Sequence, residues 1–269
     1  IEDSPESLAA DIHAKTHGQV DDRLAQALAR SIGPTIDWLA ERHRVPWVLA
    51  GGFDYPGHAV RRMHGVPSRT GAELEDHLVR AANDAGIDVI TSARVSALYA
   101  DGDVVRGLAI TRPDGSGEAV GCRALVLACC GFGGNRAMLA RYIPLMADAP
   151  FLGHAGNEGD GIRWGEALGG APTDMGAFQG HGSVAVPYNI GISWAVMMAG
   201  GIQVNARGER FAHEHRGYSE QALDVLRQPG AIAFDIYDAR CHEVALGFGH
   251  YRDAVAAGAI RIAPSAAAL

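Results

Sequence analysis

The run Leu125–Asn135, with the sequence LVLACCGFGGN, places a short apolar segment directly before a glycine-rich turn. The apolar residues Ala124–Ala128 predict a buried strand, and the glycines that follow would let backbone amides approach a ligand. A tight strand-to-helix connection without any ligand explains the same run equally well, because a short glycine pattern is weak evidence by itself.

The residues before this run predict helices and then strands. Apolar spacing over residues 8–43 predicts helices, which Gly33 and Pro34 divide. Ser68–Ala85 predicts a further helix with a capping box at its start and Gly86 after its end. The predicted strands are Ile87–Ile90, Val95–Leu98, Val104–Thr111 and, after a turn at residues 113–115, Ala119–Arg123. This order favours a mixed α/β (α+β) fold with an antiparallel excursion.

The pattern changes after Asp174, where strands and turns around Val184–Val204 precede a helix at Glu220–Leu226. A strand at Ala231–Ile236 and a helix at Asp238–Gly247 are expected to follow. We therefore expect a boundary near Asp174–Gln179, with one domain over residues 1–174 and another over residues 175–269.

Composition excludes several classes of partner. The 269 residues carry a formal net charge of -8 and contain no run of Lys or Arg, so nucleic acid is not an expected partner. The longest apolar runs, near Ala124–Cys130 and Ile192–Ile202, are too short to span a bilayer.

The four cysteines form no CxxC pair. We expect them to be reduced and buried, which is typical of a cytoplasmic protein, and we expect no metal site.

Two further motifs follow the glycine turn. Residues 156–162 read GNEGDGI, and Asp160 between two glycines could cap the following helix, the commoner role, or bind a polar ligand group. Residues 200–214 read GGIQVNARGERFAHE and alone predict a strand, a turn and a second strand. Arg210 and Glu214 could simply form an ion pair with each other.

Taken together and in this order, with Asp174-Met175 and His181 between them, the three motifs resemble the flavoprotein family of fumarate reductases, succinate dehydrogenases, tricarballylate-type dehydrogenases and 3-ketosteroid dehydrogenases. The resemblance extends from about Leu24 to Ile262. It implies a Rossmann-like FAD-binding domain over residues 1–174 and an inserted α+β capping domain over residues 175–269.

The resemblance also implies a cofactor site for FAD. In the family, the residue matching Val95 touches the adenosine half through its backbone, and the aspartate matching Asp160 contacts the cofactor. The residues that it places near FAD are Val95, Ala128, Cys129, Cys130, Gly131 and Asp160. The chain departs from the family at Cys129 and Cys130, where Thr and Gly are usual, and the second change adds a β-carbon near the ligand.

Three residues are the catalytic candidates. His181 matches a histidine that binds a substrate carboxylate in fumarate reductases. Tyr218 stands where those enzymes have a proton-donating arginine, and Arg216 lies two residues earlier. We expect Tyr218 to transfer a proton and Arg216 and His181 to hold a carboxylate, although a tyrosine packed at a helix start is an equal alternative.

The expected function is that of an FAD-dependent oxidoreductase acting on a C–C bond next to a carboxylate or carbonyl, with hydride transfer through flavin N5. Expected partners are a small carboxylic acid or ketosteroid-like substrate and an electron-transfer protein. One alternative is a 3-ketosteroid-type dehydrogenase. Another is an incomplete chain that binds no flavin, because the family's strand–GxGxxG–helix and its C-terminal segment are missing and the chain opens with Ile1 rather than Met.

Overall fold

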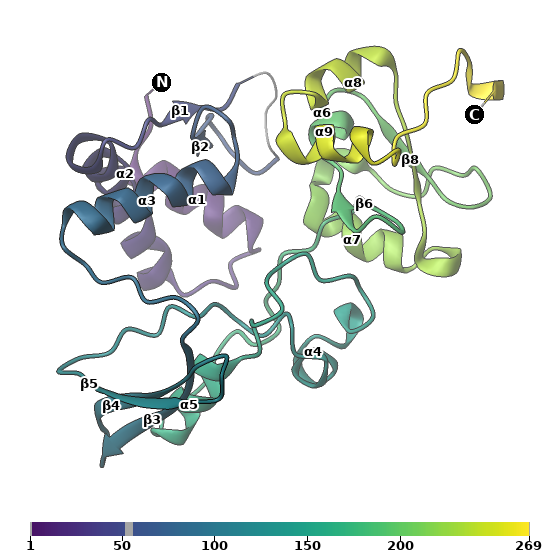
Figure 1. Cartoon of the computed structure of the whole chain (residues 1–269). Helices are drawn as coiled ribbons and strands as arrows, with labels where there is room; N and C mark the ends of the chain where they lie inside the picture. Colours follow the sequence, from purple (N-terminus) through teal and green to yellow (C-terminus); the bar gives the residue numbers. More distant parts are fainter. Residues whose placement is uncertain (1, 52–55, 269) are drawn as a thin grey trace. The chain divides into compact units, whose positions relative to one another are not determined.

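The structure, a computed structural model, describes residues 2–51 and 56–268, and Figure 1 traces its elements. Two compact units make up the chain: Ile1–Ile87 with Gly180–Leu269 form the first, and Asp88–Gln179 the second. One division between the units falls between Gln179 and Gly180, directly after the predicted boundary region Asp174–Gln179. The assignment of residues 1–174 to a cofactor domain and of residues 175–269 to a capping domain stays a prediction.

The described chain contains both helices and strands, in agreement with the expected mixed fold. The α-helices are α1 Pro5–Lys15, α2 Asp22–His43, α3 Gly71–Asp84, α4 Arg136–Tyr142, α5 Asp160–Ala167, α6 Ala195–Met198, α7 Tyr218–Leu226, α8 Ala239–Ala245 and α9 Gly249–Ala256. The strands are β1 Val48–Leu49, β2 His64–Gly65, β3 Arg94–Asp101, β4 Val104–Thr111, β5 Gly117–Gly121, β6 Val184–Ala185, β7 Ile190–Gly191, β8 Ile202–Val204 and β9 Phe234–Ile236. Short 3-10 helices cover Pro144–Met146 (η1), Glu214–Arg216 (η2), Pro229–Ala231 (η3) and Ala266–Ala268 (η4).

The second unit is built on an antiparallel sheet in the order β3-β4-β5. The predicted hairpin is confirmed, with β4 at the predicted bounds and Gly115 in the connecting turn at a φ of 84°. A small core of Phe132, Leu139 and Ile143 joins the glycine turn to α4.

The predicted strand at Ala124–Ala128 is wrong for this structure. These residues form no strand, and the side chain of Val126 is 85% exposed. A strand needs hydrogen-bonded neighbours, and no described residue pairs with this segment. The expected strand Ile87–Ile90 is absent for the same reason.

The cysteine prediction is correct in one respect and wrong in another. All four cysteines are free thiols, and Cys241 is buried. Cys129 and Cys130 are exposed, and Cys122 is partly buried.

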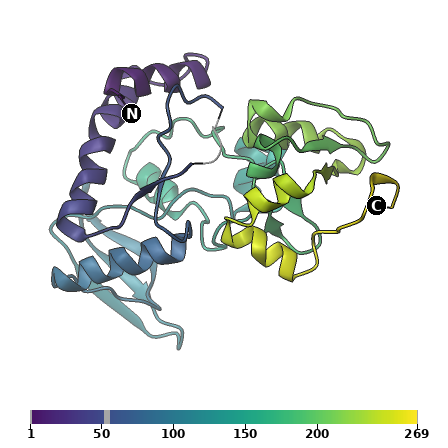
Figure 2. The same ribbon diagram turned by 90° about the horizontal axis from the view of Figure 1, so that it is seen from above.

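In the first unit, α2 runs without a break through Pro34, and Figure 2 shows it as one continuous helix. The predicted division at Gly33-Pro34 is therefore wrong. Proline removes only one backbone donor, and the hydroxyls of Ser31 and Thr35 each bond to a carbonyl one turn earlier at 2.7 Å.

The predicted cap of α3 is confirmed. Thr70 accepts a hydrogen bond from the amide of Glu73 at 3.3 Å, and Gly86 follows the helix at a φ of 68°. The Glu73 carboxylate returns to the amide of Ser68, at 2.8 Å, rather than to that of Thr70.

The C-terminal part of the first unit has its own apolar core. Trp194, Met197 and Tyr251 are among its fully buried side chains, contributed by α6 and α9 and the residue before α6. Strand β8 pairs antiparallel with β9 beside this core. The partly buried side chain of Tyr218 packs against this core.

Candidate functional site

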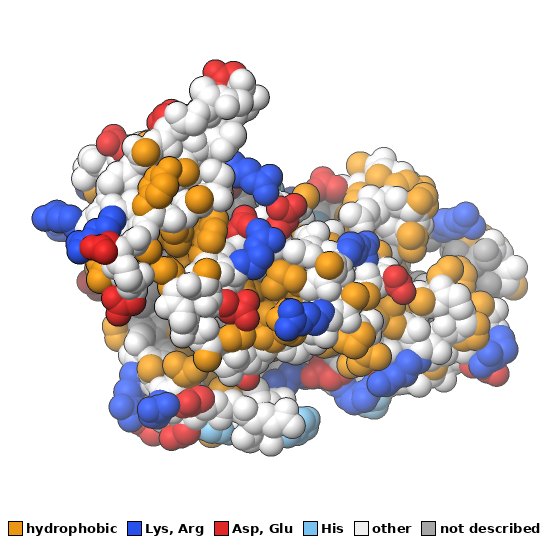
Figure 3. Space-filling view, turned by 90° about the horizontal axis from the view of Figure 1, so that it is seen from below, with side chains coloured by type: hydrophobic (Ala, Val, Ile, Leu, Met, Phe, Trp, Pro, Cys, Tyr) orange, Lys and Arg blue, Asp and Glu red, His pale blue; other side chains and the backbone are white. Residues whose placement is uncertain are grey.

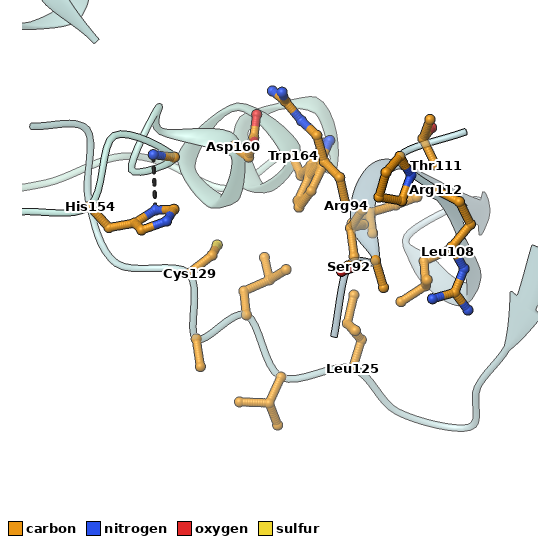
Figure 4. Close-up of a pocket in the computed structure, with 18 residues that line it drawn as sticks. Ser92, Arg94, Leu108, Thr111, Arg112, Leu125, Cys129, His154, Asp160 and Trp164 are labelled. Carbon is orange, nitrogen blue, oxygen red and sulfur yellow. Dashed lines mark hydrogen bonds between the residues drawn. The ribbon is translucent and has the colours of Figure 1, made fainter. Parts of the chain in front are cut away.

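A cavity of about 850 Å³ lies in the second unit (Figure 4). Its walls come from β3, from β4, from the segment Leu125–Cys129 and from the first turn of α5. This volume lies within the roughly 300–1,000 Å³ that small-molecule sites usually occupy. The cavity is therefore large enough for a substantial part of a dinucleotide.

The structure brings together four of the six predicted cofactor residues. Val95, Ala128, Cys129 and Asp160 all line the cavity, although they come from three separate segments. Cys130 and Gly131 are not among its lining residues.

Asp160 does not cap α5, so the commoner role expected for it is wrong. The cap is Gly159, with a φ of 83°, and Asp160 is the first helical residue. Its carboxylate pairs with Arg163 one turn later, and a negative charge in the first turn is favoured by the helix dipole. Asp160 is therefore held at the cavity wall by its own helix.

The glycines of the turn serve two different purposes. A β-carbon at Gly134 would lie 2.5 Å from the carbonyl oxygen of Ala155, and one at Gly133 would collide with the ring of Phe151. Nothing lies within 4 Å of the corresponding position at Gly131. Packing within the chain therefore explains Gly133 and Gly134, whereas Gly131 leaves open space next to the backbone.

Cys130 has a left-handed backbone with a φ of 57°. Only glycine adopts this conformation without a steric penalty. Cys130, which the resemblance matches to a glycine, thus has a backbone conformation that favours glycine.

The cavity residues fit the adenosine half of FAD. Apolar side chains such as Val95 and Leu108 offer packing surfaces. Arg94 and Arg112 also line the wall, where they pair with Glu158 and Glu118. Figure 4 shows Cys129 and Asp160 on the same side of the cavity, with His154 nearby. His154 accepts a hydrogen bond from the amide of Gly156 at 3.0 Å, which fixes its ring.

His181 and Tyr218, two of the three catalytic candidates, lie together in the first unit. Their rings are stacked, with centroids 5.3 Å apart and planes 21° from parallel. The ring of Trp194 makes a second contact with His181, with ring centroids 6.1 Å apart and ring planes at 90°. Trp194 is a site neighbour that the sequence analysis missed, because it lies in an apolar run typical of a core.

Local contacts determine the protonation of His181. Burial lowers its pKa, and the nearby His250 lowers it further. Its Nδ1 accepts the backbone N–H of Ser183 at 3.3 Å, which leaves the hydrogen of the neutral ring on Nε2. His181 is therefore a neutral donor near pH 7.

Arg216 is placed differently from this pair. Its guanidinium is exposed and forms an ion pair with Asp224 of α7. Arg210 likewise pairs with Glu214, as expected, and the Glu214 side chain is fully buried. Both guanidinium groups thus already have carboxylate partners.

No group of three or more side chains suited to holding a metal occurs in residues 2–51 and 56–268. Over the same residues, no helix combines the length and apolar character needed to cross a bilayer. On the face drawn in Figure 3, acidic and basic side chains are interspersed and form no single basic area.

Residues 1–242 match the family model described as FAD binding domain. The chain belongs to this family of FAD-binding domains. FAD is therefore its cofactor, and the resemblance seen in the sequence is confirmed.

Curated relatives of the family include a probable fumarate reductase of Shewanella frigidimarina, 29% identical over 91% of this chain and 42% of its own length. An NADH:fumarate oxidoreductase of Klebsiella pneumoniae is 28% identical over 88% of this chain and 26% of its length. The chain thus spans less than half of each of these relatives.

Solved structures agree with the mixed fold. The open conformation of a flavocytochrome c3 fumarate reductase matches with a TM-score of 0.76 at 28% identity, over 93% of this chain and 45% of that one. A 3-ketosteroid-Δ4-(5α)-dehydrogenase of Rhodococcus jostii RHA1 has a TM-score of 0.68 at 22% identity, over 90% and 55%; that likeness concerns the fold.

Proposed function

We propose that the chain is part of an FAD-dependent oxidoreductase that adds or removes hydrogen across a C–C bond next to a carbonyl or carboxylate. The observation that carries this proposal is the cavity in which Val95, Ala128, Cys129 and Asp160 meet. These residues would hold the adenosine half of the cofactor. When bound, FAD supplies hydride transfer at its N5 atom.

The protein's own groups handle the proton and the substrate oxygen. We assign proton transfer to the phenol oxygen of Tyr218, whose ring is held against His181. The Nε2–H of His181 would donate a hydrogen bond to the substrate oxygen, where negative charge develops during reaction. Trp194 and Tyr218 add aromatic surface beside that oxygen.

Two substrate classes are candidates. The fumarate reductases among the relatives favour a carboxylic acid. Two observations favour a neutral ketone or enone, including a ketosteroid-like one. His181 is neutral. In addition, Arg210 and Arg216 already pair with the carboxylates of Glu214 and Asp224 rather than with a substrate carboxylate. An electron-transfer partner and a cytoplasmic location, which free thiols would suit, belong to the same proposal.

The test begins with flavin retention. The purified chain is incubated with excess FAD, desalted and examined for flavin absorption near 450 nm (a property of the cofactor). Retention at a roughly equimolar level, and its loss in Asp160→Ala, is the expected result. No retention would favour an incomplete chain that binds no flavin.

Loaded protein is then supplied with a reduced dye and either fumarate or a cyclic enone. Dye oxidation with one substrate selects its class. If the flavin-loaded protein fails to oxidise the dye with both fumarate and the enone, the proposed reaction is contradicted.

A further inference from the structure

Lys15, the last residue of α1 and the only lysine in the sequence, reaches the segment that carries Tyr218. Its ammonium donates to the backbone carbonyl of Arg216 at 3.3 Å and forms an ion pair with Glu220. These two contacts lie on either side of Tyr218 in the sequence. We call Lys15, Glu220 and the carbonyl of Arg216 the lysine clamp.

The backbone inside the lysine clamp favours glycine. Gly217 has a φ of 126°, in the region that favours glycine. A β-carbon there would lie 2.6 Å from Oε2 of Glu220 and 3.4 Å from Nζ of Lys15. The turn that leads into Tyr218 is therefore packed directly on the ion pair.

A second set of contacts holds the same turn from the opposite segment. Ser219 donates its hydroxyl to the carbonyl of Gly180 at 3.1 Å, and Gly180 immediately precedes His181. The Tyr218 ring is thus fixed by the lysine clamp at its backbone and by the segment of His181 at its side.

The charge state of Glu220 keeps the clamp closed near neutral pH. Partial burial is the largest single influence and opposes ionisation, but the hydrogen bond and charge of Lys15, a backbone hydrogen bond and the charge of Arg216 together lower the pKa of Glu220. The second carboxylate oxygen is buried and has no hydrogen-bond partner among the described residues. Lys15 is therefore the side chain that contributes most to the stabilisation of the Glu220 carboxylate.

We propose that Lys15 is a positioning residue that holds Tyr218 against His181. Acylation by an activated acyl donor, such as an acid anhydride, releases the tyrosine: the deprotonated amine forms an amide, the acyl–oxygen bond of the anhydride breaks, a carboxylate leaves, and the positive charge of Lys15 is lost. The role given to Tyr218 rests on the proposed function, whereas the geometry of the lysine clamp does not. Since no other side chain in the sequence carries a primary amine, amine-reactive reagents at high pH modify Lys15 and the N-terminus.

The test measures the ring stack itself. A tyrosine ring over an imidazole shifts the carbon-bound protons of that imidazole, so NMR of histidine-labelled protein reports the stack, with His181→Asn to assign the signal. Tyr218→Leu should abolish the shift. Lys15→Gln, Glu220→Gln and acetylation of Lys15 should reproduce that loss, while Lys15→Arg should retain the shift.

Reductive methylation provides a matched chemical control, because it keeps the charge that acetylation removes. It is performed on folded protein, so it remains informative even if Lys15→Gln fails to fold. Arg106→Gln, which breaks an exposed ion pair with Asp101 on the β3–β4 hairpin, controls for the loss of one positive charge.

An unchanged His181 signal after acetylation or in Glu220→Gln would overturn the proposal. So would a loss of the shift after methylation or in Arg106→Gln. Flavin retention is measured separately on the same samples. Its absence would count against the proposed function, and the His181 signal would still decide the role of Lys15.

Discussion

The sulfur of Cys129 packs on the first turn of α5 so closely that a β-carbon at Gly161 would lie 2.7 Å from it. Cys129 lines the cavity, and Gly161 follows Asp160, which lines it too. The glycine thus allows the cysteine segment and the helix to approach each other closely at the cavity wall. Flavin binding should depend on this approach.

Gly161→Ala should push Cys129 away from α5, because overpacking of this kind costs about 1–3 kcal/mol. We expect flavin affinity to fall by roughly tenfold, which corresponds to about 1.4 kcal/mol. Fluorescence titration with FAD measures the effect. Gly165→Ala is the matched control, since nothing lies within 4 Å of a β-carbon there. Cys129→Ala combined with Gly161→Ala should restore binding, and failure of that rescue would contradict the steric explanation.

Tyr218→Phe should slow turnover of the flavin-loaded protein, or of a longer enzyme that contains this chain, by at least about tenfold. General acid–base groups commonly contribute 10²–10⁴. The ring and its stack on His181 are preserved, so flavin retention should not change. Tyr99→Phe on the exposed side of β3 is the control. Equal rates for the two variants would remove Tyr218 from the reaction.

Stability should fall as pH drops below about 6.5, the ordinary pKa of histidine. Burial lowers the pKa of His181, so the unfolded chain binds a proton that the folded chain resists. The contribution is complete above pH 6.5 and is lost as the pH falls toward the lowered value. Burial lowers the pKa of neighbouring His250 in α9 as well, which adds a dependence of the same sign.

Urea unfolding at several pH values measures this dependence. His181→Asn should flatten the curve between pH 7 and 5, whereas His64→Asn, at an exposed histidine, should leave it unchanged. A curve that stays equally steep without His181 would show that the imidazole is not resisting protonation.

Tyr251→Phe should destabilise the C-terminal core by about 1–3 kcal/mol, the usual cost of leaving buried polar groups unpaired. The Tyr251 hydroxyl lies 2.8 Å from the hydroxyl of Tyr237 and 2.8 Å from Nδ1 of His242, and its side chain is fully buried. Thermal unfolding followed by circular dichroism gives the change. Tyr188→Phe, at an exposed tyrosine, is the matched control, and equal losses in the two variants would be inconsistent with a buried network.

Local signals in the sequence predicted local structure. Thr70 caps α3 because its hydroxyl, next to the helix start, accepts a hydrogen bond from the nearby backbone amide of Glu73. The turn at residues 113–115 sets the hairpin because its closing contacts lie within a few residues. The family motifs, read together, also selected four residues that share one cavity.

Signals that depend on distant neighbours could not be read in this way. The apolar residues Leu125–Ala128 have strand character, but a strand exists only when another strand pairs with it. The contact of Lys15 with Arg216 joins positions 201 residues apart, and neither residue carries a pattern that points to the other. Trp194 looks like any other core residue until the ring of His181 is placed beside it.

Gly217 limits how this chain can acquire a different chemistry. Any other residue at that position would be held at a φ of 126°, which L-residues rarely adopt, and its β-carbon would displace the Glu220 carboxylate, so such variants should be rare in any selected population. The neighbouring positions 216 and 218 carry no such restriction. Natural drift or a mutagenesis library would therefore change the reactive group at Arg216 or Tyr218 while the spacing between them stays constant.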